Sequence, residues 1–147
     1  MRRYPVRMLM MTAAAAMLAA CDGSPTGPAV AGLLEITPDQ PSYAAGSVVS
    51  LTLRNPSQQT VTYATCSAYR LERRLSGMWV PAPREASFEL CAFSHGAVQP
   101  GQSTTEHARL MVDQAPGMYR VVFVDVTATP NRAGGDEPSQ PFEVTRR

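Results

Sequence analysis

The sequence has no lysine, two histidines, three cysteines and one tryptophan in 147 residues. All 13 basic residues are arginines, they face 12 acidic residues, and the formal net charge is +1. Removal of a leader with Arg2, Arg3 and Arg7 leaves a net charge of about −2, since 10 basic residues then remain with the same 12 acidic residues. Proteins that hold nucleic acid neutralise phosphates with a basic surplus. This charge balance argues against a nucleic-acid partner.

The sequence also lacks the short motifs of common catalytic sites. It contains no Gly-x-Ser-x-Gly, no His-Glu-x-x-His, no phosphate-binding loop and no glycine-rich dinucleotide turn. His95 and His107 are the only histidines, and a zinc or copper site would need more ligands near them. We therefore expect no metal, no cofactor and no catalytic residues.

Long apolar runs are absent as well. The longest, Met8 to Ala20, is thirteen residues, whereas a membrane-spanning helix needs about 20. It follows the basic segment MRRYPVR and ends in small residues. This order of a charged region, a short apolar region and small residues predicts a secretory signal peptide over residues 1–20, with a membrane span as the alternative.

The signal ends in Leu18-Ala19-Ala20-Cys21, which resembles the lipobox of bacterial lipoproteins. The resemblance implies cleavage before Cys21, a diacylglyceryl group on its sulfur and a further acyl chain, such as palmitate, on its amine. Two or more chains anchor a protein stably to a membrane. The alternative is a chance cysteine after an ordinary signal. Residues 21–31 are the expected lipidated N-terminus and flexible tether, because DGSPTGPAVA is rich in Gly and Pro and has no periodicity.

Two cysteines, Cys66 and Cys91, remain once Cys21 is lipidated. Outside the cytoplasm an even pair normally forms a disulfide. A loop of this length gives roughly 3.5 kcal/mol by the chain-entropy estimate. We expect a structural bridge, since a redox pair would favour the Cys-x-x-Cys spacing that this sequence lacks.

Residues 32–147 consist of short alternating segments separated by Gly and Pro turns. Ser47 to Arg54 shows this best, with Val49, Leu51 and Leu53 on one face. Residues 61–80, with a turn at Ser76-Gly77, are expected to form the central pair of strands, and Asn131 to Glu137 a loop. Strands are expected at Leu33–Thr37, Ser47–Arg54, Thr60–Cys66, Tyr69–Leu75, Ser87–Phe93, Ser103–Val112, Met118–Val126 and Pro141–Thr145. The pattern predicts one all-β domain, an antiparallel β-sandwich of about seven or eight strands.

A turn before the predicted penultimate strand carries a family resemblance. Pro116-Gly117-Met118-Tyr119 resembles the tyrosine corner of immunoglobulin-like domains, in which the hydroxyl bonds to the backbone upstream. Over residues 33–126 the order of motifs is similar to that of a bacterial Ig-like domain, a kind found on secreted and lipid-anchored proteins. Leu51 and Val121 stand where antibody domains carry their core cysteines. The supporting motifs are Tyr43-x-x-Gly46, Leu51-x-Leu53-x-Asn55, Leu71-Glu72 with Trp79, and Pro100-Gly101. The same order gives a more distant similarity to the bacterial intracellular proteinase inhibitor domain.

Two features could bind a ligand. Arg70, Glu72, Arg73 and Arg74 form either an anion site or the solvated face of a strand with its cross-strand pairs. Arg73 falls on the apolar side of the alternation, which predicts a bulge or a strand end there.

The second feature is the apolar run from Met118 to Val126. Tyr119, Val121 and Phe123 alternate onto one face, and a second apolar set alternates onto the other. Since a sandwich strand normally buries one face, the second set is either covered by another segment or exposed for a partner. The predicted partner-binding residues are Met118, Val122, Val124 and Val126.

Together these patterns predict a lipid-anchored, cell-envelope Ig-like binding module without catalytic activity. The alternative is an envelope proteinase inhibitor or a small hydrolase on the same scaffold, because fold alone does not fix function. A hydrolase would need a convergent polar pocket near His95 or His107. A spacer without a ligand is the third possibility. The sequence leaves open the partner, the oligomeric state and the choice of inner or outer membrane.

Overall fold

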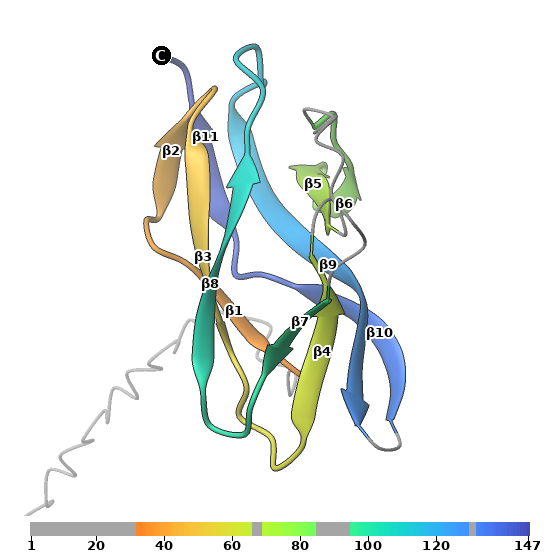
Figure 1. Ribbon diagram of the computed structural model, residues 1–147. Coiled ribbons are helices and arrows are strands. Elements are labelled where there is room, and N and C mark those ends of the chain that lie inside the picture. Colours follow the sequence, from red (N-terminus) through yellow and green to blue (C-terminus); the bar gives the residue numbers. More distant parts are fainter. Residues whose placement is uncertain (1–31, 66–68, 85–94, 130–131) are drawn as a thin grey trace, which may run out of the picture.

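The computed structural model describes residues 32–65, 69–84, 95–129 and 132–147. These residues form eleven strands and no helix (Figure 1), so the predicted all-β class is confirmed with more strands than expected. The strands are β1 (Glu35–Pro38), β2 (Ser42–Ala44), β3 (Val48–Arg54), β4 (Thr60–Ala64), β5 (Tyr69–Leu75), β6 (Met78–Pro81), β7 (His95–Val98), β8 (Ser103–Arg109), β9 (Gly117–Thr129), β10 (Arg132–Pro138) and β11 (Phe142–Thr145).

Two sheets pack face to face as a β-sandwich (Figure 1). One has the order β1-β3-β8, and the other has the order β2-β11-β9-β4-β7, with β5 and β10 also paired to β9, and β6 to β5. All pairs are antiparallel except β2 with β11. The alternation predicted for β3 is confirmed, since Val49, Leu51 and Leu53 are fully buried. They meet apolar residues of the second sheet, such as Val61 and Val121, in one core.

Strand β9 runs through the centre of the larger sheet. Residues 117–123 of β9 pair with β11 and β5, and residues 127–129 pair with β4, while β10 pairs with β9 from Val122 to Ala128. Residues 61–80 are therefore not the central pair of strands, because β4 and β5 each pair with β9 instead of with one another. The β5–β6 hairpin does turn at Ser76-Gly77, as predicted, with φ values of 49° and 85° that fit a tight hairpin turn.

A break in alternation divides β9. Asp125 has a φ of 54°, a left-handed conformation that L-residues seldom adopt in a strand. On its N-terminal side Val121 and Phe123 face the core, whereas on its C-terminal side Val126 and Ala128 do so. The extra residue behaves as a β-bulge and moves the even-numbered positions to the inside.

Two glycines explain strands that the sequence did not predict. The expected loop at residues 131–137 is instead strand β10 over residues 132–138, paired with β9 through two register shifts. A Cβ on Gly134 would lie 2.6 Å from Thr127 Cγ2, so glycine permits this close approach. In β7, a Cβ on Gly96 would lie 2.3 Å from Tyr63 Cζ. Both strands depend on a glycine, which has no side chain to clash with its neighbour. The alternation of apolar and polar residues along the sequence does not detect this.

The bond expected of a tyrosine corner is present. Tyr119 donates from its hydroxyl to the Ala115 carbonyl oxygen at 2.6 Å, and its ring is buried and stacks with Phe142. It fixes the loop between β8 and β9 against the start of β9.

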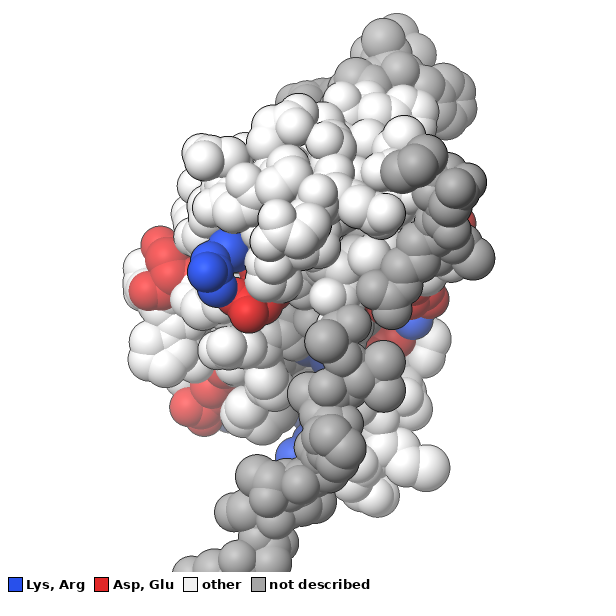
Figure 2. Space-filling view, turned by 90° about the horizontal axis from the view of Figure 1, so that it is seen from below, with Lys and Arg blue, Asp and Glu red and all other residues white. Residues whose placement is uncertain are grey.

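At the other end of the sandwich, a fully buried Asn55 joins two loops. Its Nδ2 donates to the carbonyls of Gln59 at 2.7 Å and Val98 at 2.8 Å, while its Oδ1 accepts from the Ser57 amide and hydroxyl. Figure 2 looks onto this end, where charged side chains are sparse. Residues 55–59 and 99–103 are all uncharged, so buried hydrogen bonds rather than ion pairs hold these loops.

Replacing Asn55 with Ala should lower the free energy of unfolding by about 2–3 kcal/mol, because two buried carbonyls and the Ser57 groups lose their partner. Urea unfolding measures the change. The matched control is Gln58→Ala, in the same loop but exposed, which should stay within about 0.5 kcal/mol of the parent. Equal effects of the two variants would contradict the assigned role of Asn55.

Candidate binding site

Three predicted site residues, Cys21, Cys66 and Cys91, lie outside the described residues, as do the signal peptide and the tether. The lipid anchor and the disulfide therefore stay predictions. None of the described residues belongs to a helix long and apolar enough to cross a membrane.

The four residues predicted to bind a partner do not form one exposed face. Met118 is 40% exposed and Val124 is half-buried, but Val122 and Val126 are 1% and 0% exposed. The bulge at Asp125 turns Val126 into the core. Val122 lies between β5 and β10, where its partners are Arg70 and Pro138. The prediction of one exposed patch is therefore wrong, because Val122 is covered by the neighbouring strands.

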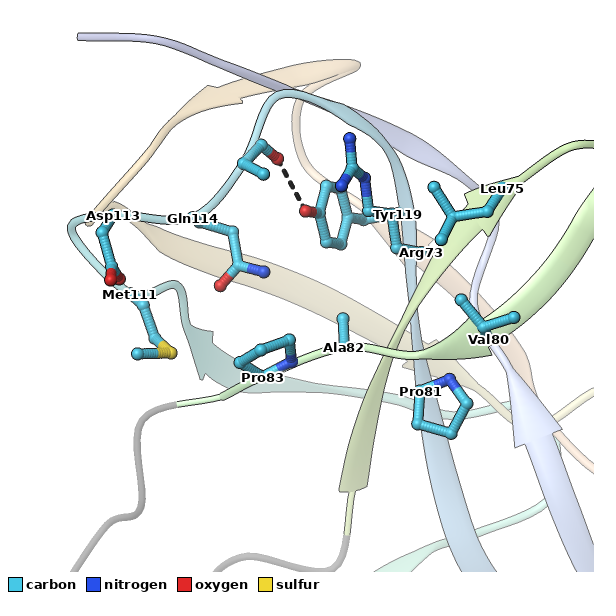
Figure 3. A pocket seen from close by; sticks show the side chains of 11 residues that line it. Arg73, Leu75, Val80, Pro81, Ala82, Pro83, Met111, Asp113, Gln114 and Tyr119 are labelled. Atoms are coloured by element: carbon cyan, nitrogen blue, oxygen red, sulfur yellow. Dashed lines mark hydrogen bonds between the residues drawn. The ribbon is translucent and has the colours of Figure 1, made fainter.

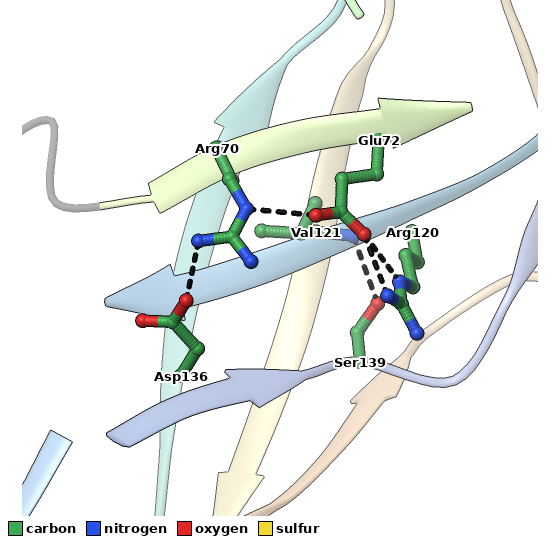
Figure 4. A network of polar contacts seen from close by, with 6 residues as sticks. All are labelled: Arg70, Glu72, Arg120, Val121, Asp136 and Ser139. Atoms are coloured by element: carbon green, nitrogen blue, oxygen red, sulfur yellow. Dashed lines mark hydrogen bonds and ion pairs between the residues drawn. The ribbon is translucent and has the colours of Figure 1, made fainter. Parts of the chain in front are cut away.

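A charged network occupies the same face of the sheet as Val122, because the register pairs Arg70 with Val122 and Glu72 with Arg120. Figure 4 shows the side chains of this network. Glu72 is only 6% exposed, and its carboxylate accepts from Arg70 Nε at 2.7 Å and from Arg120 Nη2 at 2.6 Å. Arg70 also pairs with Asp136 of β10, and the Arg120 guanidinium lies 4.6 Å from the Trp79 ring centroid. The side chains of β5, β6, β9 and β10 are thus tied together across four strands.

The ionisation of Glu72 fits this role. Burial alone raises the pKa of its carboxyl, but hydrogen bonds and charges from Arg70 and Arg120 outweigh burial and lower it. The arginines share a carboxylate of this chain, which supports the interpretation of the cluster as cross-strand pairing rather than as an anion site.

Arg73 behaves differently from its neighbours. β5 continues through it without a register shift, from Tyr69 opposite Phe123 to Arg73 opposite Tyr119, so the expected bulge is absent. Its guanidinium instead lies 5.9 Å from the Tyr119 ring centroid, and Nη2 donates to the Pro116 carbonyl at 2.7 Å. An inward arginine is tolerated because the core ends here and backbone carbonyls lie within reach.

Beside Arg73 lies a pocket of about 330 Å³, at the lower end of ligand-site volumes. It lies between the β5–β6 hairpin, with the residues that follow it, and the loop joining β8 to β9 (Figure 3). Its polar lining residues are Arg73, Asp113, Gln114 and Tyr119, and its apolar lining residues are Leu75, Val80, Pro81, Ala82, Pro83, Met111 and Ala115.

Two polar atoms in this pocket have no hydrogen-bond partner in the described part of the chain: Gln114 Oε1 and Arg73 Nε. Gln114 is 6% exposed, and Figure 3 shows its amide extending from the loop toward Ala82 and Pro83. Buried polar groups are nearly always paired, and leaving one unpaired costs about 1–3 kcal/mol. A buried amide with an open acceptor is thus a candidate ligand contact.

Exposed apolar side chains lie at the same end of the sandwich as the pocket. The strand register brings together the start of β3, the tip of the β5–β6 hairpin, the β8–β9 loop and the start of β9. All large hydrophobic residues recorded as exposed in the described chain fall there. We call this surface the apolar end; it comprises Val48, Leu75, Met78, Val112 and Met118.

The histidines lie elsewhere. His95 is on β7 and His107 on β8, in different sheets, both are exposed, and neither lines this pocket. His107 Nδ1 is 3.3 Å from Ser50 Oγ on the neighbouring strand. Across the described ranges no three His, Cys, Asp or Glu side chains are grouped so that they could hold a metal ion.

Sequence reasoning missed Gln114 and assigned Arg73 to the wrong kind of feature. Arg73 did carry a signal, because it interrupted an apolar face. Gln114 carried none, since it lies in a loop whose path depends on both sheets.

Comparison with known proteins gives no family. No protein-family model matches the chain, and no curated protein matches it. Among solved structures, it is similar to a β-glucosidase from Listeria innocua in complex with gluconolactone, at 18% identity and a TM-score of 0.34 over 76% of this chain. It is also similar to the alkylpurine DNA glycosylase AlkC of Pseudomonas fluorescens bound to DNA containing an abasic site analog, at 15% identity and a TM-score of 0.33 over 78%. It spans 16% and 31% of those chains, and likeness at this level carries no functional argument.

The Glu72 network predicts a pH dependence of stability. The pKa of Glu72 is lowered on folding, so its contribution is present above its ordinary pKa of 4.5 and is lost as the pH falls through the folded value. We expect Glu72→Gln to cost about 1–3 kcal/mol at pH 7, and the difference from the parent to shrink at pH 3.

Urea unfolding at both pH values measures this difference. The exposed Glu143 provides the control, since Glu143→Gln should change little at either pH. A Glu72→Gln deficit of the same size at pH 3 and pH 7 would rule out the charged network as its cause.

Proposed function

We propose that this chain is a lipid-anchored cell-envelope module that binds an envelope protein through its apolar end and has no catalytic activity. The observation that carries the proposal is the pocket with the unpartnered Gln114 Oε1, at the end of the sandwich where the exposed apolar side chains lie. Exposed apolar surface around a pocket is typical of a binding site. A spacer module would have no need to keep its exposed hydrophobic residues at one end.

The direction of the chain supports this arrangement. Glu35 at the start of β1 pairs with Arg54 at the end of β3, whereas Val48 at the start of β3 belongs to the apolar end. The tether would therefore join the sandwich far from the apolar end. A module held through Cys21 would present that end away from the membrane.

The pocket lining favours binding over hydrolysis. Its described lining residues include no serine, cysteine or histidine, so among them there is no serine or cysteine nucleophile and no histidine base. The alternative hydrolase was expected near His95 or His107, and this pocket includes neither.

The anchor is tested by Cys21→Ser in cells. We expect the parent to fractionate with membranes and to partition into detergent, and the variant to lose both properties, because the lipidated sulfur is gone. Mass spectrometry of the mature N-terminus is the matching readout. An unmodified Cys21 in a membrane-free parent would contradict the lipoprotein assignment.

The binding surface is tested by crosslinking in cells that express the full-length protein. We expect a reproducible crosslinked partner that is lost in Leu75→Asp and in Val112→Asp, because a charge desolvated in an apolar interface is costly. The control, Gln99→Asp, is an equally exposed position at the opposite end and should keep the partner. Loss in all three variants, or in none, would refute the assignment of the apolar end.

A further inference from the structure

We propose that the pocket binds an extended, uncharged peptide segment with apolar side chains, one of whose backbone amides pairs with Gln114. This inference rests on the proposed function and names the ligand of the same pocket. It starts from the unpartnered polar atom of Gln114 and proceeds to the walls and the rim.

The open polar atom of Gln114 requires a ligand that donates a hydrogen bond. Gln114 Oε1 is an open acceptor, so the ligand has to supply an N–H or O–H. Arg73 Nε also has no partner in the described chain, but it lies over the start of β9, 3.1 Å from the position that a Cβ on Gly117 would take, so Gln114 alone sets this requirement. A carboxylate cannot donate, whereas a peptide group carries one donor.

The walls exclude a strongly charged ligand. Seven of the eleven lining residues are apolar, and the two charged ones, Arg73 and Asp113, are of opposite sign. The described lining residues thus carry one charge of each sign and no cluster of like charge that would hold a phosphate, a carboxylate or a cation. Uncharged apolar side chains fit the remaining surface without the cost of burying a charge.

The rim indicates a ligand longer than the pocket. Leu75 lines the pocket yet is 45% exposed, and Val112, next to lining residues on both sides, is 76% exposed. A small molecule filling the pocket would leave Val112 in water. A peptide that continues from the pocket across Val112 covers both side chains.

The test uses the full-length protein purified from membranes, labelled with ¹⁵N and titrated with N-acetyl-Val-Leu-N-methylamide. We expect saturable NMR shifts in the Gln114 side-chain amide and in the backbone of Leu75 and Val112. Three matched esters each replace one of the three amide N–H groups of this ligand with oxygen, and the ester that removes the N–H paired with Gln114 should bind about tenfold more weakly, since one well-made hydrogen bond is worth about this ratio.

Gln114→Leu should remove the preference for amide over ester by weakening only the amide ligand. The control Gln102→Leu is exposed at the opposite end and should keep the preference. Equal affinity of the amide and of all three esters in the parent would overturn the inference without any variant. Absence of saturable shifts at Gln114 would overturn it too.

The alternative ligand of the pocket is a second copy of this chain, and it would give a different result. Analytical ultracentrifugation of a dilution series measures self-association. Self-association that the peptide inhibits and that is lost in Val112→Asp would show that the pocket binds a neighbouring copy. This result would overturn the peptide assignment. Failure of the peptide alone, with the partner still lost in Leu75→Asp and Val112→Asp, rejects this inference and retains the proposed function. Failure of both rejects the apolar end as a binding surface.

Discussion

Strand β9 pairs with four other strands, and the larger sheet depends on the way it divides between them. It pairs with β11 and β5 before Asp125 and with β4 after it, while β10 pairs with it on both sides of Asp125. The bulge at Asp125 keeps apolar residues on the core side along both halves, since Phe123 precedes it and Val126 follows it. An unbroken strand of this length would place Val126 on the outer face. The local backbone conformation of one residue thus sets which apolar side chains make the core.

The buried polar groups fall into two kinds, and the difference locates the site. Asn55 and Glu72 are buried with several partners each, and they fasten loops and strands to one another. Gln114 is equally buried, yet its Oε1 has no partner within the described ranges. Satisfied buried groups add specificity to a fold, whereas an unsatisfied one costs stability. The cost at Gln114 is offset if a ligand supplies the missing donor, which is why this amide, rather than the charged network, points to binding.

The position of the pocket follows from the way the sandwich ends. The core stops at Tyr119, whose hydroxyl fixes the β8–β9 loop, and the β5–β6 hairpin extends beside that loop. The Arg73 guanidinium lies against the Tyr119 ring and donates to the Pro116 carbonyl. The space between hairpin and loop is therefore bordered by fixed elements, and preorganisation of this kind lowers the entropy lost on binding. The same geometry separates the pocket from the start of β1, where the chain enters the domain.

The sequence by itself determined the all-β class, the buried face of β3 and the hairpin turn at Ser76-Gly77, because each follows from local alternation or turn chemistry. The bond of Tyr119 was expected from the resemblance to the tyrosine corner. The sequence also predicted an anchor at Cys21 and a disulfide, which lie in segments that the structure does not describe. The tertiary structure decided the remaining features. The inside position of Val126 depends on a bulge, strand β10 depends on close approach at Gly134, and the surroundings of Gln114 are built by residues far apart in the chain. A side chain acquires a partner, or lacks one, only when distant segments meet, and no local pattern records that.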